Sequence, residues 1–223
     1  MSAPETKPRA YCWFDTEFTS LELDEASLIQ VSLVVTDIAL QPIVPVDPPG
    51  VPPELLEKNG VNVYLARPED WVPGEFHRKE MMEVLEQCAK SSHTVEQADM
   101  WLSHYLDAAI GPPAASERER PLLAGNSIHN DWFLARRDMP LFSARLHYRL
   151  LDVSSLKSEW MSGLGGGGGK VLDKDDRKAL TEAFPAFDLG GAKAHDAYFD
   201  AQASLAELAW YRARMGQASS AES

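Results

Sequence analysis

Apolar residues gather first in short runs that predict strands. Residues 11–18 are apolar and β-prone, and residues 28–36 (LIQVSLVVT) have the β-branched enrichment of a buried strand. Further short apolar runs, each typical of a strand, lie at 39–46, 122–125 and 146–153. The chain therefore predicts a sheet built from its first two thirds.

Helical spacing appears between and after these runs. Thr94 and Gln97 match a capping box, and apolar residues follow at helical intervals from position 98 to position 105. Ser154 is a candidate cap for another helix. Further helices are predicted at 131–137, at 177–184 before Pro185, and at 196–215 before Gly216. Strands alternating with helices predict an α/β fold in which helices flank a mixed sheet.

The sequence favours one domain over residues 1–223, with three irregular segments inside it. Residues 42–53 contain six prolines and predict an extended connection rather than a helix or a central strand. Residues 111–120 read as a polar surface loop. Residues 163–169 form a glycine-rich loop that includes five consecutive glycines.

Charge and composition narrow the possible partners. The chain has 21 basic and 34 acidic residues, for a net charge of −13, so bulk electrostatics do not favour binding to long DNA or RNA. No apolar run is long enough for a membrane span, and the first residues resemble no targeting signal. Two cysteines, Cys12 and Cys88, argue against a disulfide framework and for a reducing compartment, so a cytoplasmic location is expected.

The strongest local chemical signal is the pair Asp15 and Glu17 within a predicted strand. Side chains two residues apart point to the same face of a strand, so the two carboxylates are expected side by side. Such a pair repels itself unless a cation lies between its members. The alternative is an edge strand on which both acids are solvated.

Two weaker signals follow. Asp131 stands at the start of a predicted helix after the turn 125–130, where an ordinary N-cap is the alternative reading. His195 and Asp200 are spaced H-x4-D, and they converge only if His195 lies in the loop before the helix that Asp196 caps. The alternative for His195 is a surface-loop histidine.

Taken together, these motifs resemble the DEDDh family of 3′→5′ exonucleases, and most closely its oligoribonucleases. The resemblance rests on four segments spread over nearly the whole chain: FDTEFTSLE (14–22), LAGNSIHNDWFLARRDMP (123–140), LHYRLLDVSSLK (146–157) and HDAYFDAQASLAELAWYR (195–212). It implies a ribonuclease H-like fold and hydrolysis of RNA of about two to five nucleotides.

The same resemblance implies a catalytic centre. Asp15, Glu17, Asp131 and Asp200 would hold two divalent ions, Mg²⁺ or Mn²⁺, and His195 would be the general base. Oxygen ligands suit these ions better than zinc.

Substrate contacts and a homodimer are also implied. Leu21 would pack against a base, Trp71 would stack on one, and Tyr148 would reach into the site of a second subunit. A terminal 5′ phosphate would be bound by Ser127, Arg149 and Ser154. The alternatives are a core position for Leu21 and ordinary strand positions for Tyr148 and Arg149.

Two other functions remain open from the sequence. One is a DEDDh exonuclease for longer RNA or DNA, which the negative charge disfavours. The other is a nucleic-acid-binding module that retains the nuclease fold without its activity, although all four acids and the histidine are present.

Overall fold

The computed structural model describes residues 9–163, 170–190 and 194–221, the last six by backbone alone. Its strands are β1 (Ala10–Phe18), β2 (Leu28–Asp37), β3 (Gly60–Tyr64), β4 (Leu122–Gly125) and β5 (Leu150–Asp152). Its α-helices are α1 (Glu75–Glu80), α2 (Met82–Lys90), α3 (Val95–Ile110), α4 (His129–Asp138), α5 (Pro140–Ser143), α6 (Val153–Met161), α7 (Arg177–Ala183) and α8 (Ala197–Ala221).

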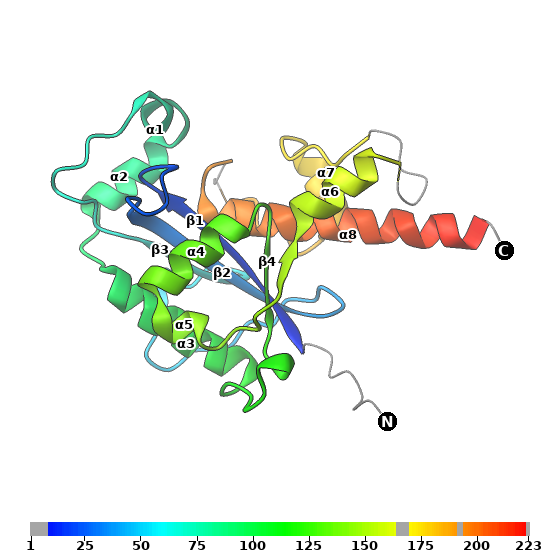
Figure 1. Cartoon of the computed structure of the whole chain (residues 1–223), viewed down its shortest axis with the longest axis horizontal. Helices are drawn as coiled ribbons and strands as arrows, with labels where there is room; N and C mark the ends of the chain where they lie inside the picture. The colour runs from blue at the N-terminus through cyan, green and yellow to red at the C-terminus, as the bar shows by residue number, and fades with distance from the viewer. Residues whose placement is uncertain (1–8, 164–169, 191–193, 222–223) are drawn as a thin grey trace.

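These five strands form one mixed sheet in the order β3-β2-β1-β4-β5 (Figure 1). β1 and β2 pair antiparallel, as do β2 and β3, whereas β4 and β5 run parallel to β1. The predicted α/β fold is confirmed, and its mixed sheet with flanking helices is consistent with a ribonuclease H-like nuclease. None of the helices in the described part of the chain has the length and apolar character needed to cross a membrane.

Each face of the sheet is covered by its own helices. Alternate residues of β1 divide between the faces: Cys12 and Phe14 pack with α3, α4 and α5, whereas Trp13 packs with α6, α7 and α8. Because strand side chains alternate, Asp15 and Glu17 share the face of Trp13. The two acids therefore point toward α8 from the central strand. This position excludes the alternative that they lie on a solvated edge.

Several predicted boundaries are confirmed. Thr94 caps α3, with Gln97 completing the capping box in both directions. Asp196 caps α8 by accepting from the amides of Tyr198 and Phe199. The proline-rich segment 42–53 has no helix or strand until a 3₁₀ turn begins at Pro53.

The predicted third strand at 39–46 is wrong. Leu40 has a φ of 67°, and the segment turns back after β2 with a single bridge between Thr36 and Pro42. Proline has no N–H to donate to a ladder, which limits pairing in this segment. The third strand is instead β3, which pairs with β2 from Gly60 to Tyr64.

Three other boundaries differ from prediction. In the 146–153 segment only Leu150–Asp152 is a strand, because the amide of Arg149 turns back to His147 Nδ1. Asp152, not Ser154, caps α6, and it accepts from the amide of Ser154. Helix α8 continues beyond Gly216 to Ala221, since glycine inside a helix costs only about 1 kcal/mol relative to alanine.

Of the glycine-rich loop predicted at 163–169, only Gly163 belongs to the described residues.

Candidate active site

Asp131 reaches the acids of β1 through a tight turn after β4. A Cβ on Gly125 would lie 2.9 Å from the Phe14 carbonyl oxygen, so glycine lets β4 end close against β1. Asp131 then lies buried in the first turn of α4, where Thr16 Oγ1 donates to its carboxylate at 2.7 Å. The routine N-cap reading is wrong, because Ile128 occupies the N-cap position and Asp131 faces the sheet.

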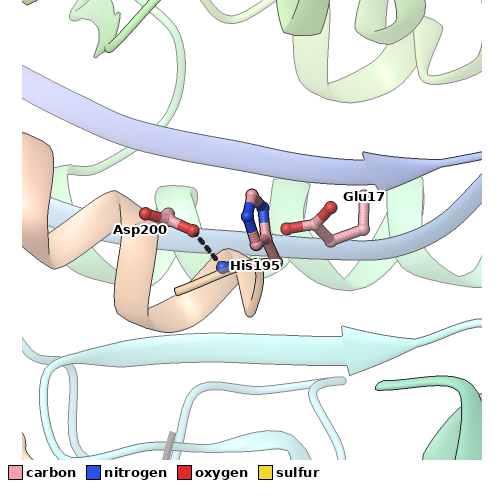
Figure 2. A group of neighbouring side chains, drawn as sticks. All are labelled: Glu17, His195 and Asp200. Atoms are coloured by element: carbon pink, nitrogen blue, oxygen red, sulfur yellow. Dashed lines mark hydrogen bonds between the residues drawn. The ribbon is translucent and has the colours of Figure 1, made fainter. Parts of the chain in front are cut away.

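His195 and Asp200 converge just before and just inside α8. His195 has a φ of 65°, and its amide donates to Asp200 Oδ2 at 2.8 Å. This left-handed residue turns the chain so that the imidazole lies between the carboxylates of Glu17 and Asp200 (Figure 2). One ligand atom from each of these three residues lies within 4.8 Å of the others. The loop position predicted for His195 is confirmed.

The electrostatics of the cluster oppose full ionisation of its carboxyls. Burial raises the pKa of Asp15 well above its usual value, and the charges of Asp131, Asp200 and Glu17 raise it further. Burial also raises the pKa of Glu17 well above its usual value, and the charge of Asp200 is the next largest cause. Burial raises the pKa of Asp131 to about 7 against the lowering effect of the Thr16 hydroxyl.

The donor set fits a hard divalent cation. Glu17, Asp200 and His195 offer two carboxylates and one imidazole, and Asp15 lies close enough for the charges of Glu17 and Asp200 to raise its pKa. Cys12 lies on the opposite face of the sheet, among the residues that pack with α3. The cluster can therefore hold a divalent metal ion through oxygen and nitrogen atoms, without a thiolate.

A buried polar network fixes the loop that carries His195. Asp196 Oδ2 accepts from Tyr64 Oη at 2.7 Å and from Gln30 Nε2 at 3.0 Å. Gln30 Oε1 in turn accepts from the amide of Ala197. The sequence predicted Asp196 as a cap but did not reveal Gln30 or Tyr64, because their partners come from distant parts of the chain.

Of the residues expected to bind a 5′ phosphate, Ser127 and Ser154 follow the carboxyl ends of the parallel strands β4 and β5, whereas Arg149 precedes β5. Ser127 has a φ of 50°, and its amide donates to Asp152 and to Ser154 Oγ at 3.1 and 3.0 Å. The hydroxyls of Ser127 and Ser154 are 3.3 Å apart. Arg149 is exposed just before β5, with its guanidinium over the ring of Tyr148.

Tyr148 is 52% exposed and stacks on His147. It lies in the turn before β5, so the ordinary strand reading is wrong for both Tyr148 and Arg149.

Leu21 and Trp71 flank the end of β1 from two different loops. Leu21 is 87% exposed between β1 and β2, which rules out the core alternative. Trp71 contacts the edge of His77 at 5.0 Å, and His77 Nε2 lies 3.3 Å from the Phe18 carbonyl oxygen.

Phe76 was not identified from the sequence. Its ring meets that of His195 edge-on at 5.1 Å, so the first turn of α1 reaches the general-base candidate. A cleft of about 970 Å³ opens beside His195 and is also lined by Tyr64, Met81 and Asp188. This cleft leaves the imidazole reachable from solvent.

Known proteins align with this sequence over most of its length. The chain is 31% identical over 203 residues to the oligoribonuclease of Nocardia farcinica, covering 90% of this chain and 78% of that protein. The chain belongs to the oligoribonuclease family. The probable oligoribonuclease of Schizosaccharomyces pombe is 30% identical over 90% of the chain and 66% of its own length. The oligoribonuclease of Idiomarina loihiensis is 28% identical over 93% and 95%.

No family model matches the chain. The relatives nevertheless confirm the family expected from the four motif segments, and with it the nuclease class of the enzyme.

Proposed function

We propose that this member of the oligoribonuclease family is a 3′→5′ exoribonuclease that degrades very short RNA to 5′-mononucleotides. The observation that carries the proposal is the convergence of Glu17, His195 and Asp200 within 4.8 Å, near the partly buried Asp15 and the buried Asp131. The oligoribonuclease relatives supply the substrate class.

Asp15, Glu17, Asp131 and Asp200 are the proposed ligands of two divalent ions, Mg²⁺ or Mn²⁺. Bound there, such ions would lower the pKa of the attacking water and stabilise the charge on the leaving oxygen. The raised pKa values of Asp15 and Glu17 support this proposal, since a bound cation offsets both the burial and the repulsion between carboxylates that raise them.

His195 is the proposed general base. It would take a proton from the attacking water, a role that requires a ring nitrogen within hydrogen-bond reach of that water. The hydrogen bond from the His195 amide to Asp200 and the network around Asp196 hold the backbone at His195 and at the residue that follows it. The adjoining cleft gives water access to the imidazole.

The substrate would be held at both ends. The 5′ phosphate would lie against the hydroxyls of Ser127 and Ser154, with Arg149 as its counter-ion. The exposed Leu21 and the partly buried Trp71, which lie near the end of β1, would pack against the bases.

Tyr148 is the proposed contribution of a second subunit in a homodimer. Its half-exposed ring is not part of the buried core of its own chain, which supports this assignment. The free thiols of Cys12 and Cys88 support the proposal that the enzyme acts in a reducing compartment such as the cytoplasm.

A length series of labelled RNA and DNA tests the function. With Mg²⁺ or Mn²⁺, we expect kcat/KM for a 5′-phosphorylated dinucleotide to exceed that for an oligomer of about 20 nucleotides, because a closed phosphate pocket excludes the next nucleotide. Arg149→Ala should reduce this ratio by about tenfold to a hundredfold, since a charge-assisted contact contributes on the order of 1.5–3 kcal/mol. Arg136→Ala, which removes an exposed guanidinium from α4, is the control.

The outcomes separate the alternatives. A ratio near one that Arg149→Ala leaves unchanged would favour an exonuclease for longer chains. RNA binding with no hydrolysis at any metal concentration would favour a non-catalytic binding module.

A further inference from the structure

A short turn before α7 carries a lysine toward the acid cluster. Leu172 is buried against α8, which anchors the segment on one side. Asp173 closes the turn by accepting from the amides of Asp175 and Asp176. Asp176 then caps α7 through the amides of its first turn. Lys174 lies at the tip of this turn, so its backbone has a defined position.

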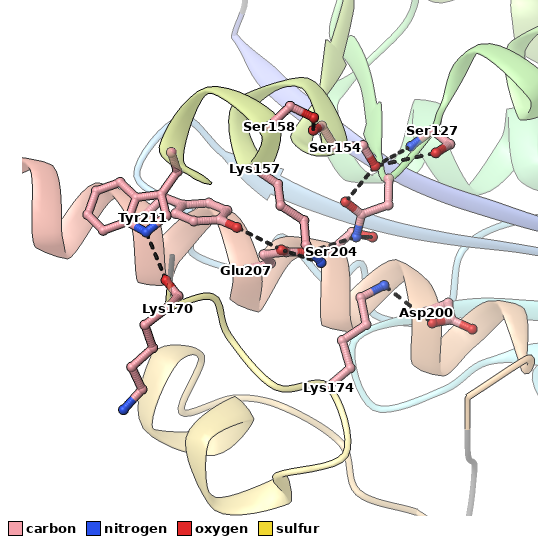
Figure 3. A network of polar contacts seen from close by, with 12 residues as sticks. Ser127, Ser154, Lys157, Ser158, Lys170, Lys174, Asp200, Ser204, Glu207 and Tyr211 are labelled. Carbon is pink, nitrogen blue, oxygen red and sulfur yellow. Dashed lines mark hydrogen bonds and ion pairs between the residues drawn. The ribbon is translucent and has the colours of Figure 1, made fainter. Parts of the chain in front are cut away.

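The Lys174 side chain reaches one of the proposed metal ligands. Its Nζ lies 3.6 Å from Asp200 Oδ1, and the two side chains are only 30% and 17% exposed. Figure 3 shows it extending from the turn to Asp200 on α8. Its charge also acts on Asp15, whose pKa it lowers while the neighbouring carboxylates raise it. The ammonium group therefore faces two of the four acids.

Both oxygens of Asp200 are already engaged. Oδ2 accepts from the His195 amide at 2.8 Å, and Oδ1 pairs with Lys174. A metal ion that takes Oδ1 must share it with an ammonium group or displace that group. Two cations within a few ångströms of each other repel, and partial burial weakens the screening by water.

We propose that Lys174 is a built-in competitor for the metal site, which neutralises Asp200 in the metal-free protein and lowers the affinity for divalent ions. This inference rests on the proposed function, because it takes Asp15 and Asp200 as metal ligands. Lys174 thereby sets the metal concentration at which the enzyme becomes active, without being needed for the chemical step.

Metal binding measured without RNA tests the proposal. Calorimetric titration of the metal-free protein with Mn²⁺ should show about tenfold tighter binding for Lys174→Met than for wild type, because one repelling charge is removed. Lys174→Arg keeps the charge and should retain the wild-type affinity. Lys178→Met removes a lysine four residues away that pairs with the exposed Glu182, and it should also leave the affinity unchanged. Equal affinities in Lys174→Met and wild type would overturn the proposal.

Two further measurements distinguish this proposal from a phosphate-binding role for Lys174 and from the proposed function itself. If Lys174 grips a substrate phosphate instead, Lys174→Met raises KM for a dinucleotide at saturating Mn²⁺ and leaves Mn²⁺ affinity unchanged, which overturns the proposal. Asp200→Asn in the same titration tests the proposed function itself. Wild-type Mn²⁺ affinity in that variant would count against the metal site, whereas weakened binding there with no effect of Lys174→Met would contradict only the role of the lysine.

Discussion

At the residue scale, the acids of the site are placed where their ionised forms are unfavourable. Asp131 is 5% exposed, and its pKa is raised to about 7, mainly by burial. A carboxyl whose folded-state pKa exceeds its unfolded value near ~3.9 stabilises the fold most at low pH. That contribution is lost as the pH rises through about 7. The buried Asp131 carboxylate, a proposed metal ligand, therefore lowers the free energy of unfolding of the metal-free protein at neutral pH.

Asp131→Asn should accordingly separate stability from activity. An amide is neutral at every pH and still accepts from Thr16 Oγ1, so it keeps the hydrogen bond without the buried charge. In EDTA at about pH 8 we expect denaturant unfolding to show a gain on the order of 2 kcal/mol over wild type, and a much smaller gain at about pH 5. RNA hydrolysis should collapse in the same variant. A variant less stable than wild type at the higher pH would contradict the electrostatic argument.

His195→Ala should affect turnover more than binding. Loss of a general base lowers kcat by about 10² to 10⁴. Affinity for a dinucleotide, measured in Ca²⁺ to prevent hydrolysis, should stay nearly unchanged. His93→Ala is the control, since His93 packs on Trp101 away from the acid cluster. A large loss of affinity with unchanged kcat would argue against the assigned role.

At the scale of elements, the site lies where β1, the start of α4 and the start of α8 meet. β2 and β3 contribute without touching the chemistry, because Gln30 and Tyr64 hold the cap of α8. Their hydrogen bonds to Asp196 fix the residue that follows His195 in the chain. The two strands therefore act as positioning elements for His195, the proposed general base.

Tyr64→Phe should test that positioning. Removing the hydroxyl leaves Asp196 one donor short, and we expect kcat to fall about threefold to tenfold with little change in KM. Tyr11→Phe is a matched control, because that hydroxyl binds the exposed Arg212. A change in KM alone, or equal effects in both variants, would indicate that Tyr64 has only a general structural role.

At the scale of the whole molecule, net charge limits the substrates that the chain can bind. A net charge of −13 gives no basic track for a long nucleic acid, so affinity must come from a few local groups. The turn before β5 would supply two of those groups, the proposed substrate contacts Tyr148 and Arg149, which are both exposed. A second subunit at this turn would complete a small, closed site.

Complementation between two inactive variants tests that arrangement. Tyr148→Ala lacks the aromatic ring, whereas Asp200→Asn lacks a metal ligand but keeps Tyr148. If Tyr148 acts across a homodimer, mixed dimers contain one complete site, and activity should rise after subunit exchange above that of either variant. Sedimentation should show a dimer at micromolar concentration. A monomer, or no recovery on mixing, would place Tyr148 in its own site.

Local patterns in the sequence determined much of the fold. β-Branched runs and a capping box depend on neighbouring residues, so β1, β2, β4 and α3 were predictable close to their observed bounds. The predicted strand at 146–153 is longer than β5, and no local pattern predicts β3 or the helices α1 and α2. A short strand such as β3 is stabilised by its partner, β2, which no local pattern reveals.

For the site, the sequence by itself determined which residue types were present and that Asp15 and Glu17 share one face, because strand periodicity is local. Only the tertiary structure decided that this face is buried against α8. It also decided that a left-handed His195 turns its ring between two carboxylates. Lys174 and Tyr64 gain their places through contacts 26 and 132 residues away along the chain. Such contacts depend on how the layers pack, and packing is a property of the whole chain rather than of any segment.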